Sequence, residues 1–190
     1  MANDCKKVRL FHQTNWEAVA SIVENGLYAK LNGCKEEDPY PPRRLAVYGS
    51  DEIQIRSIAR SSQEGRVTDW SGASLDNTPV IEYEVCADEV MVGDLYRECG
   101  DDYLDTLVTY NEFLEETRGG WARGRYQEPE FFIPDDMENI PYQAVNAERQ
   151  RKGLDPLDHP VSGMRSSKPR ILPSQIKAIH RMKDFVFNHD

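Results

Sequence analysis

Residues 8–27 read VRLFHQTNWEAVASIVENGL, and this stretch decides how the fold is expected to begin. Its first four residues form an apolar, strand-favouring run and predict a short strand. Asn15 is placed to cap a helix whose apolar residues recur at helical spacing, and Gly26 is placed to end that helix. His12 and Thr14 therefore lie where a strand gives way to a helix, a position at which side chains can serve a ligand.

Short strands and helices are expected along the rest of the chain. Apolar runs predict strands at residues 44–48, 80–86, 90–95 and 130–133, with one or two closing strands in residues 171–190. Helices are expected after a cap at Ser50, over residues 103–117 and over residues 143–153. This mixture, without internal repeats, predicts an α+β fold with a mostly antiparallel sheet that could be split, in a single domain over residues 1–190.

Three polar segments separate these elements. Residues 61–78 form a Gly- and Ser-rich stretch long enough to predict a binding loop or lid rather than a plain connection. Residues 118–126 read RGGWARGRY and are expected to form a flexible loop, and residues 117–127 are expected to contact a binding partner. Residues 154–170 are expected to form an exposed loop.

The charge balance limits which partners the whole surface can attract. The 190 residues include 23 Lys and Arg against 33 Asp and Glu, which gives a net charge of −10. That balance argues against phosphate-driven binding of nucleic acid over the entire surface, but it leaves room for a local basic cleft. Two clusters could form one: Arg43 with Arg44, and Arg118 with Arg123 and Arg125.

The chain is expected to be cytoplasmic and to have no membrane partner. No apolar run reaches the ~20 residues that span a membrane, and the N-terminal MANDCKKVRL has no apolar signal region. Cys5, Cys34, Cys86 and Cys99 show no CxxC spacing, which predicts free thiols in a reducing compartment. The four histidines are scattered, so no metal site is expected.

Three features of the sequence occur together in one known group of enzymes. An apolar strand ends in His-x-Thr at His12, a second strand ends in Tyr48, and Glu130 opens the apolar run EFFI. In this order they resemble the ADP-ribosyltransferase superfamily, whose PARP-like branch carries a histidine, a tyrosine and a glutamate on separate strands. LFHQTNWEAVASIVENGL is similar to the first motif of that branch, and QEPEFFIP is similar to its glutamate motif. The chain looks most like the DarT toxins, which ADP-ribosylate nucleic acid.

The resemblance implies a split, mostly antiparallel sheet with flanking helices that holds NAD as a substrate. Carried over to this sequence, it makes His12 a ligand of the adenosine-side ribose and the backbone at Gln13 a ligand of the nicotinamide amide, with a hydroxyl contact from Thr14. DarT-like toxins place an arginine in the loop after the first helix. Arg43 or Arg44 would therefore pair with the diphosphate, and the sequence does not decide between them.

The expected catalytic residues are Glu130, His12 and Tyr48. Breaking the bond between nicotinamide and ribose creates an oxocarbenium-like centre, and a carboxylate beside that ribose can hold the 2′-hydroxyl, favour positive charge, and orient or deprotonate the acceptor. Glu130 is the candidate for this role. Tyr48 would stack on the nicotinamide ring. The PARP-like branch has a second tyrosine about one helix further on, where this chain reads SIAR at residues 57–60.

The acceptor is expected to be a macromolecule, with nucleic acid favoured over protein. Arg123, Arg125 and Trp121 offer charge and stacking for an exposed base or strand. Glu128 and Glu130 form a Glu-Pro-Glu sequence that resembles the paired acids of arginine-modifying toxins, in which Glu128 would help to activate a protein side chain. The resemblance to toxins also implies a neutralising antitoxin as a partner.

Other functions stay open on the sequence alone. A protein-modifying ADP-ribosyltransferase would share the same core residues, and RNA 2′-phosphotransferases also use NAD and a similar histidine-containing start. An inactive relative would bind NAD or a partner without turnover, and an unrelated α+β protein would have no NAD site. The sequence has no phosphate-binding GxxxxGK[ST] loop, no GxGxxG after a strand and no HExxH.

Overall fold

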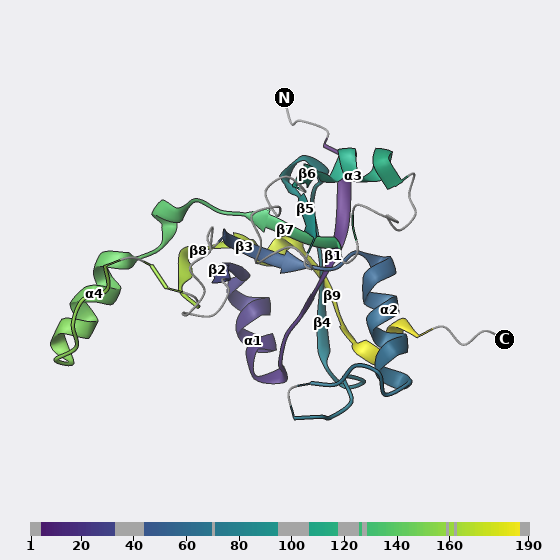
Figure 1. Cartoon of the computed structure of the whole chain (residues 1–190), viewed down its shortest axis with the longest axis horizontal. Coiled ribbons are helices and arrows are strands. Elements are labelled where there is room, and N and C mark those ends of the chain that lie inside the picture. Colours follow the sequence, from purple (N-terminus) through teal and green to yellow (C-terminus); the bar gives the residue numbers. More distant parts are fainter. Residues whose placement is uncertain are drawn as a thin grey trace.

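A small sheet of three strands forms one half of the fold (Figure 1). Strand β1 (Lys7–Gln13) pairs antiparallel with β4 (Pro79–Cys86), and β4 pairs antiparallel with β9 (Ile176–Arg181). Buried and half-buried residues alternate along much of β4, as expected for a strand with one face in the core and one toward water. The computed structural model describes residues 5–32, 44–69, 71–94, 107–117, 126, 129–158, 160–161 and 163–186.

The larger sheet has six strands and is also antiparallel throughout. Their order across the sheet is β6 (Val108–Thr109), β5 (Met91–Asp94), β7 (Pro129–Pro134), β3 (Arg44–Gly49), β2 (Leu27–Asn32) and β8 (Arg165–Ile171). The two sheets meet where Phe11 of β1 and Ser50, just after β3, exchange backbone hydrogen bonds of 2.9 and 2.8 Å. The predicted α+β class with a mostly antiparallel sheet is confirmed.

Four α-helices lie in the described ranges, and none of them is long and apolar enough to cross a membrane. They are α1 (Trp16–Asn25), α2 (Glu52–Gln63), α3 (Tyr110–Thr117) and α4 (Tyr142–Arg151). Short 3₁₀ segments are η1 (Ala87–Glu89), η4 (Met137–Asn139), η5 (Pro173–Gln175) and η6 (Met182–Phe185). Figure 1 shows α1 and α2 near the two sheets, whereas α4 projects away from them.

The ends of α1 follow the prediction. The side chain of Asn15 accepts a 2.8 Å hydrogen bond from the backbone N–H of Ala18, and Gly26 ends the helix with a φ of +87°. A Cβ at Gly26 would lie 2.2 Å from the carbonyl oxygen of Ile171. Glycine is therefore required both by the left-handed backbone and by the close approach of β8.

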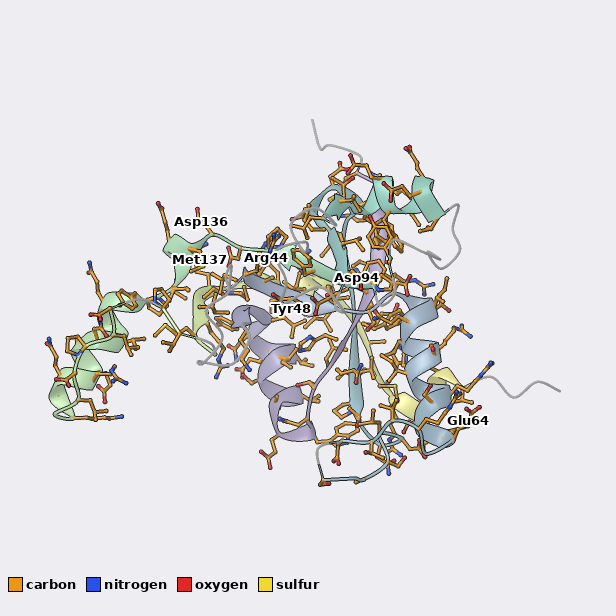
Figure 2. The ribbon with its side chains drawn as sticks, viewed as in Figure 1. Arg44, Tyr48, Glu64, Asp94, Asp136 and Met137 are labelled. Atoms are coloured by element: carbon orange, nitrogen blue, oxygen red, sulfur yellow. A yellow bond between two sulfur atoms is a disulfide. The ribbon has the colours of Figure 1, made fainter. Side chains whose placement is uncertain are left out.

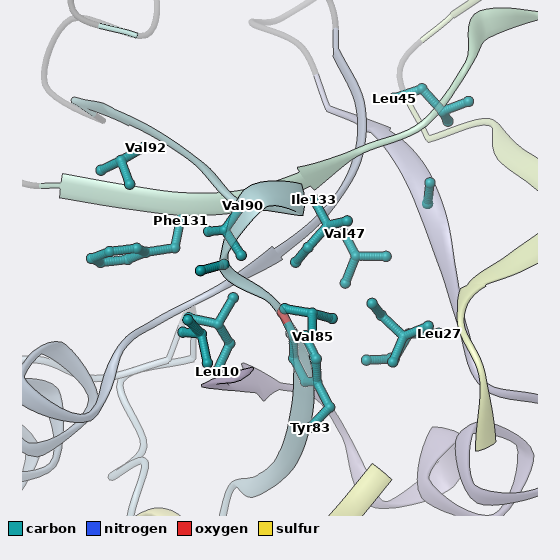
Figure 3. Packing of buried hydrophobic residues seen from close by; sticks show 14 of the residues in the cluster. Leu10, Leu27, Leu45, Val47, Tyr83, Val85, Val90, Val92, Phe131 and Ile133 are labelled. Atoms are coloured by element: carbon teal, nitrogen blue, oxygen red, sulfur yellow. The ribbon is translucent and has the colours of Figure 1, made fainter. Parts of the chain in front are cut away.

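The main core lies between the two sheets (Figure 3). Leu10 and Val85 reach it from the smaller sheet, and Val47 and Ile133 reach it from the larger one. Because successive residues of a strand point to opposite faces, the residues next to Val47 and Ile133 lie on the other face of the larger sheet. That face carries the residues on which the candidate site depends.

Some expected element boundaries are wrong. The helix expected over residues 103–117 begins only at Tyr110, because Val108 and Thr109 pair with β5 as strand β6; residues 103–106 lie outside the described ranges. The cap of α2 is Asp51 rather than Ser50, and its side chain accepts a 2.7 Å hydrogen bond from the backbone of Gln54.

The expectation of an exposed loop over residues 154–170 is wrong at its C-terminal end. Strand β8 begins at Arg165 and pairs with β2. Pro169 within this strand obscured it in the sequence, since proline interrupts a central strand, but β8 is an edge strand and tolerates it.

The expectation of free thiols is wrong for Cys5 and Cys86. Their sulfur atoms are joined in a disulfide, with Cα atoms 5.6 Å apart. The register of β1 against β4 explains this contact, because Lys7 lies opposite Cys86 and brings Cys5 alongside the end of β4. Cys34 and Cys99 lie outside the described residues.

Candidate functional site

His12 lies near the end of β1, where its ring meets the backbone of β3. Its Nδ1 is 2.8 Å from the carbonyl oxygen of Tyr48. A carbonyl only accepts, so Nδ1 donates and Nε2 carries no proton in the neutral ring. Burial lowers the pKa of His12 below its ordinary value of 6.5; the hydrogen bond to Tyr48 opposes this shift and the charge of Lys30 adds to it. At pH 7 the imidazole is therefore neutral, and Nε2 can accept a hydrogen bond from a ligand hydroxyl.

Tyr48, Phe132 and Glu130 lie on one face of the larger sheet. Tyr48 in β3 is directly opposite Phe132 in β7, and residues two apart on a strand share a face, which places Glu130 with them. The intervening positions, among them Val47 and Ile133, belong to the core on the other face. We call the first surface the site face and define it by Arg44, Tyr48, Glu130 and Phe132.

Aromatic and cationic groups are packed together on the site face. The rings of Tyr48 and Phe132 have centroids 5.8 Å apart, and the guanidinium of Arg44 lies 5.4 Å from the centre of the Phe132 ring. The Tyr48 hydroxyl donates a 3.3 Å hydrogen bond to the carbonyl of Arg44. Figure 2 shows Arg44 and Tyr48 on the larger sheet. Phe132 is fully buried and the other two are half-buried, so a planar ring and an anionic group could both be held here.

Glu130 is half-buried near the start of β7. The residue directly opposite it in β5 is Gly93, which adds no side chain at that position. The preceding residue, Pro129, accepts a 2.9 Å hydrogen bond from Nε2 of Gln54, which ties the start of β7 to α2. Asp94, labelled in Figure 2, lies opposite Pro129 and is fully buried.

Gln13 and Thr14 continue from His12 into the turn before α1. Gln13 lies opposite Val80 of β4, and the backbone N–H of Thr14 donates a 3.1 Å hydrogen bond to the carbonyl of Pro79. Both side chains are partly exposed. The turn is thus held against the start of β4 by its backbone, which leaves these side chains available to a ligand.

Sequence reasoning missed two residues of this region. Lys30 lies opposite Ala46 in the pairing of β2 with β3, on the same side of the sheet as Tyr48, and its charge reaches His12. Phe132 forms the buried floor beside Tyr48. The alternation within EFFIP could have placed Phe132 with Glu130, but Lys30 had no signal because strand β2 was not expected.

Several expected site residues cannot be placed against these groups. Arg43, Glu128, Trp121, Arg123 and Arg125 lie outside the described residues, whereas Arg44 is described and lies on the site face. Among the residues that the structure describes, no three His, Cys, Asp or Glu side chains gather in a way that could hold a metal ion.

Comparisons with protein-family models, with curated proteins and with solved structures return no match for this chain. A neutral imidazole with an accepting nitrogen, an aromatic floor with a guanidinium beside it, and a half-buried carboxyl come from three neighbouring strands.

Proposed function

We propose that the chain is an NAD-dependent ADP-ribosyltransferase that moves ADP-ribose from NAD to a macromolecular acceptor and releases nicotinamide. The observation that carries the proposal is the placement of three residues. His12 donates to the backbone of Tyr48 at 2.8 Å, while the side chains of Tyr48 and Glu130 lie on one face of adjacent strands. An enzyme of this kind needs such a set: a ribose ligand, a stacking ring and a carboxylate.

NAD would be held by the turn after β1 and by the site face. The unprotonated Nε2 of His12 would accept a hydrogen bond from the adenosine-side ribose, and Gln13 and Thr14 would bind the nicotinamide amide and a neighbouring hydroxyl. Tyr48 would stack on the nicotinamide ring. Arg44 is the described candidate for the diphosphate, because its guanidinium already lies over the aromatic floor of the site.

Glu130 would act at the ribose that loses nicotinamide. The bond from C1′ to the pyridinium nitrogen breaks, and both electrons leave with nicotinamide. A nucleophilic atom of the acceptor forms the new bond to C1′, and its proton passes to the carboxylate of Glu130. The same carboxylate would hold the ribose 2′-hydroxyl and stabilise the positive charge that develops as the first bond breaks.

Nucleic acid is the acceptor that we favour, and we place the reaction in the cytoplasm. Trp121, Arg123 and Arg125 supply an aromatic ring and charges for an exposed base, and Glu128 would lie near the same acceptor. A transferase of this kind would damage its own cell, so a neutralising antitoxin belongs to the proposal. In a reducing cytoplasm the bond between Cys5 and Cys86 would be exposed to exchange with other thiols.

The acceptor can be identified with labelled NAD. The purified chain is incubated with NAD that carries a label in the ADP-ribose part, together with separate fractions of cellular DNA, RNA and protein. Label in a nucleic-acid fraction supports the favoured acceptor, whereas label in protein supports the alternative that Glu128 and Glu130 suggest. Release of a 2′-phosphate from RNA would assign the phosphotransferase instead, and NAD binding without turnover in any fraction would assign a binding protein.

A further inference from the structure

A cavity lies apart from His12 and Tyr48, between the start of β1, the start of α2 and helix α3. Its volume is about 320 Å³, which is near the lower end of the ~300–1,000 Å³ range that is typical of small-molecule sites in proteins. Neither His12 nor Tyr48 lines it. Pro129 does; it precedes Glu130 on β7, and because successive side chains point to opposite faces of a strand, the cavity lies on the other face of the larger sheet from the Glu130 carboxyl.

One part of this cavity is aromatic and apolar. Tyr110, Phe113 and Leu114 of α3 line it. Phe113 is held from behind by edge-on contacts with Tyr126 and Phe131, at centroid distances of 5.2 and 5.4 Å. Phe113 is almost fully buried and is therefore fixed in place, whereas Tyr110 is only partly buried. The exposed part of the Tyr110 ring can therefore stack against a planar ring of a ligand.

The rim of the cavity carries positive charge without an acidic partner. Lys6 and Lys7 line it and are exposed, and neither pairs with a carboxylate in the part of the chain that the structure describes. Arg9, by contrast, is 3.4 Å from Glu52 and 3.6 Å from Glu82. On a chain with a net charge of −10, two adjacent lysines left unneutralised at a cavity indicate a site for an anionic group.

Asp51 adds an acceptor to the wall between these two parts. Its carboxyl caps α2 and lines the cavity. Burial raises the pKa of Asp51, and the Asp51 charge contributes, after burial, to the raised pKa of the Tyr110 hydroxyl, so the two groups are electrostatically coupled. A ligand hydroxyl between them would find an acceptor in Asp51 and a donor in Tyr110.

We propose that this cavity binds a nucleoside monophosphate unit. The base would lie against Tyr110 and the apolar side of α3, a ribose hydroxyl would reach Asp51, and the phosphate would be bound by Lys6 and Lys7. The unit has two sources with the same chemistry, a free nucleotide or one nucleotide of a single strand. Binding at this site does not depend on transferase activity.

The test is a calorimetric titration of the full chain with thymidine 5′-monophosphate, with thymidine and with a short oligothymidylate. Thymine is used because it is absent from NAD, and each titration is repeated with NAD in excess. The combined substitutions Lys6→Glu and Lys7→Glu remove the phosphate contacts, and Tyr110→Leu removes the ring while keeping an apolar side chain. Lys177→Glu with Lys183→Glu is the matched control, since both lysines are exposed and neither lines the cavity.

Saturable binding of the monophosphate is expected, weakened by about tenfold or more in the Lys6 and Lys7 variant and unchanged in the control. Tyr110→Leu is expected to weaken the binding of the monophosphate and the binding of thymidine to a similar extent. If the monophosphate and the oligonucleotide bind with similar affinity, the natural ligand is a free nucleotide. If the oligonucleotide binds much more tightly and the same substitutions weaken its binding, the natural ligand is a single strand. Absence of saturable binding, binding that both variants leave unchanged, or displacement by NAD would overturn the inference.

Discussion

His12 couples the protonation state of one ring to the stability of the fold. Burial holds its pKa below 6.5 in the folded protein, so between that lowered value and 6.5 the unfolded chain binds more protons than the folded one. The free energy of unfolding should therefore fall as the pH drops through 6.5. The variant His12→Asn lacks the titrating ring and so lacks this pH dependence of the free energy of unfolding. Its amide nitrogen can still donate a hydrogen bond to the carbonyl of Tyr48.

Urea denaturation of both proteins at pH 7.5 and pH 5 checks this prediction, with the values compared as a difference between variants so that other titrating groups cancel. The wild type should lose more stability on acidification than His12→Asn. Equal losses in the two proteins would show that the His12 ring is not desolvated as the structure has it.

At the scale of elements, the contact between the two sheets depends on Gly49 at the end of β3. A Cβ there would lie 2.6 Å from the hydroxyl of Tyr83 and 3.3 Å from the carbonyl of Phe11. Tyr83 is fully buried and its ring cannot swing away, so Gly49→Ala should lower the free energy of unfolding by about 1–3 kcal/mol through overpacking. Gly49→Ala would also disturb the contact between β1 and the end of β3, which holds the ring of His12 against the carbonyl of Tyr48.

A double-mutant cycle separates the clash from other effects. The Tyr83 hydroxyl is buried and has no hydrogen-bond partner in the described part of the chain, so Tyr83→Phe alone should cost little. In the Tyr83→Phe protein, Gly49→Ala should therefore lower the free energy of unfolding much less than it does in the wild type. Chemical denaturation of all four proteins measures this difference. An unchanged cost of Gly49→Ala would mean that the tyrosine hydroxyl is not what the methyl group meets.

Elements with a complete local signal were predictable from the sequence. Helix α1 has a cap at Asn15, a periodic apolar face and a terminating glycine within one short stretch, and the structure reproduces each of them. Strand β8 carries serine, lysine and proline, and only its partner β2 makes it a strand. Such edge strands depend on tertiary pairing, which a local pattern does not contain.

The residues of the candidate site also differ in whether the local sequence or the tertiary pairing of strands reveals them. His12, Tyr48 and Glu130 were predicted because each borders an apolar run and because, in this order, they resemble the motifs of the ADP-ribosyltransferase superfamily. Lys30 was missed because its place follows from the pairing of β2 with β3. The disulfide of Cys5 with Cys86 was missed because it depends on the register of β1 against β4, between residues 81 positions apart.

At the scale of the whole molecule, that disulfide closes a long loop. Cys5 and Cys86 are 81 residues apart in the sequence and join the segment before β1 to the end of β4. Closing a loop of this length restricts the unfolded chain, so replacing both cysteines by serine should lower the free energy of unfolding by about 2–4 kcal/mol.

Thermal unfolding with and without dithiothreitol tests this effect. The reductant should lower the Tm of the wild type and leave the Tm of the doubly substituted protein unchanged. A wild-type Tm that is insensitive to full reduction would contradict a stabilising bond between these two residues.

The proposed transferase activity depends on the carboxylate of Glu130, held on the same face as Tyr48 by the pairing of β3 with β7. Glu130→Gln keeps the shape of the side chain and removes its charge, so NAD should still bind while the rate of nicotinamide release falls by about 10²–10⁴-fold. Glu138→Gln is a matched control, because Glu138 is an exposed residue of η4 and lies outside the site face.

The most direct measurement is nicotinamide release by the wild type, Glu130→Gln and Glu138→Gln, with NAD binding to each protein measured in parallel and with mixed nucleic acid as the acceptor. We expect turnover by the wild type and by Glu138→Gln, and NAD binding with little turnover by Glu130→Gln. Turnover that survives Glu130→Gln, or a wild type that neither binds NAD nor releases nicotinamide, would contradict this expectation.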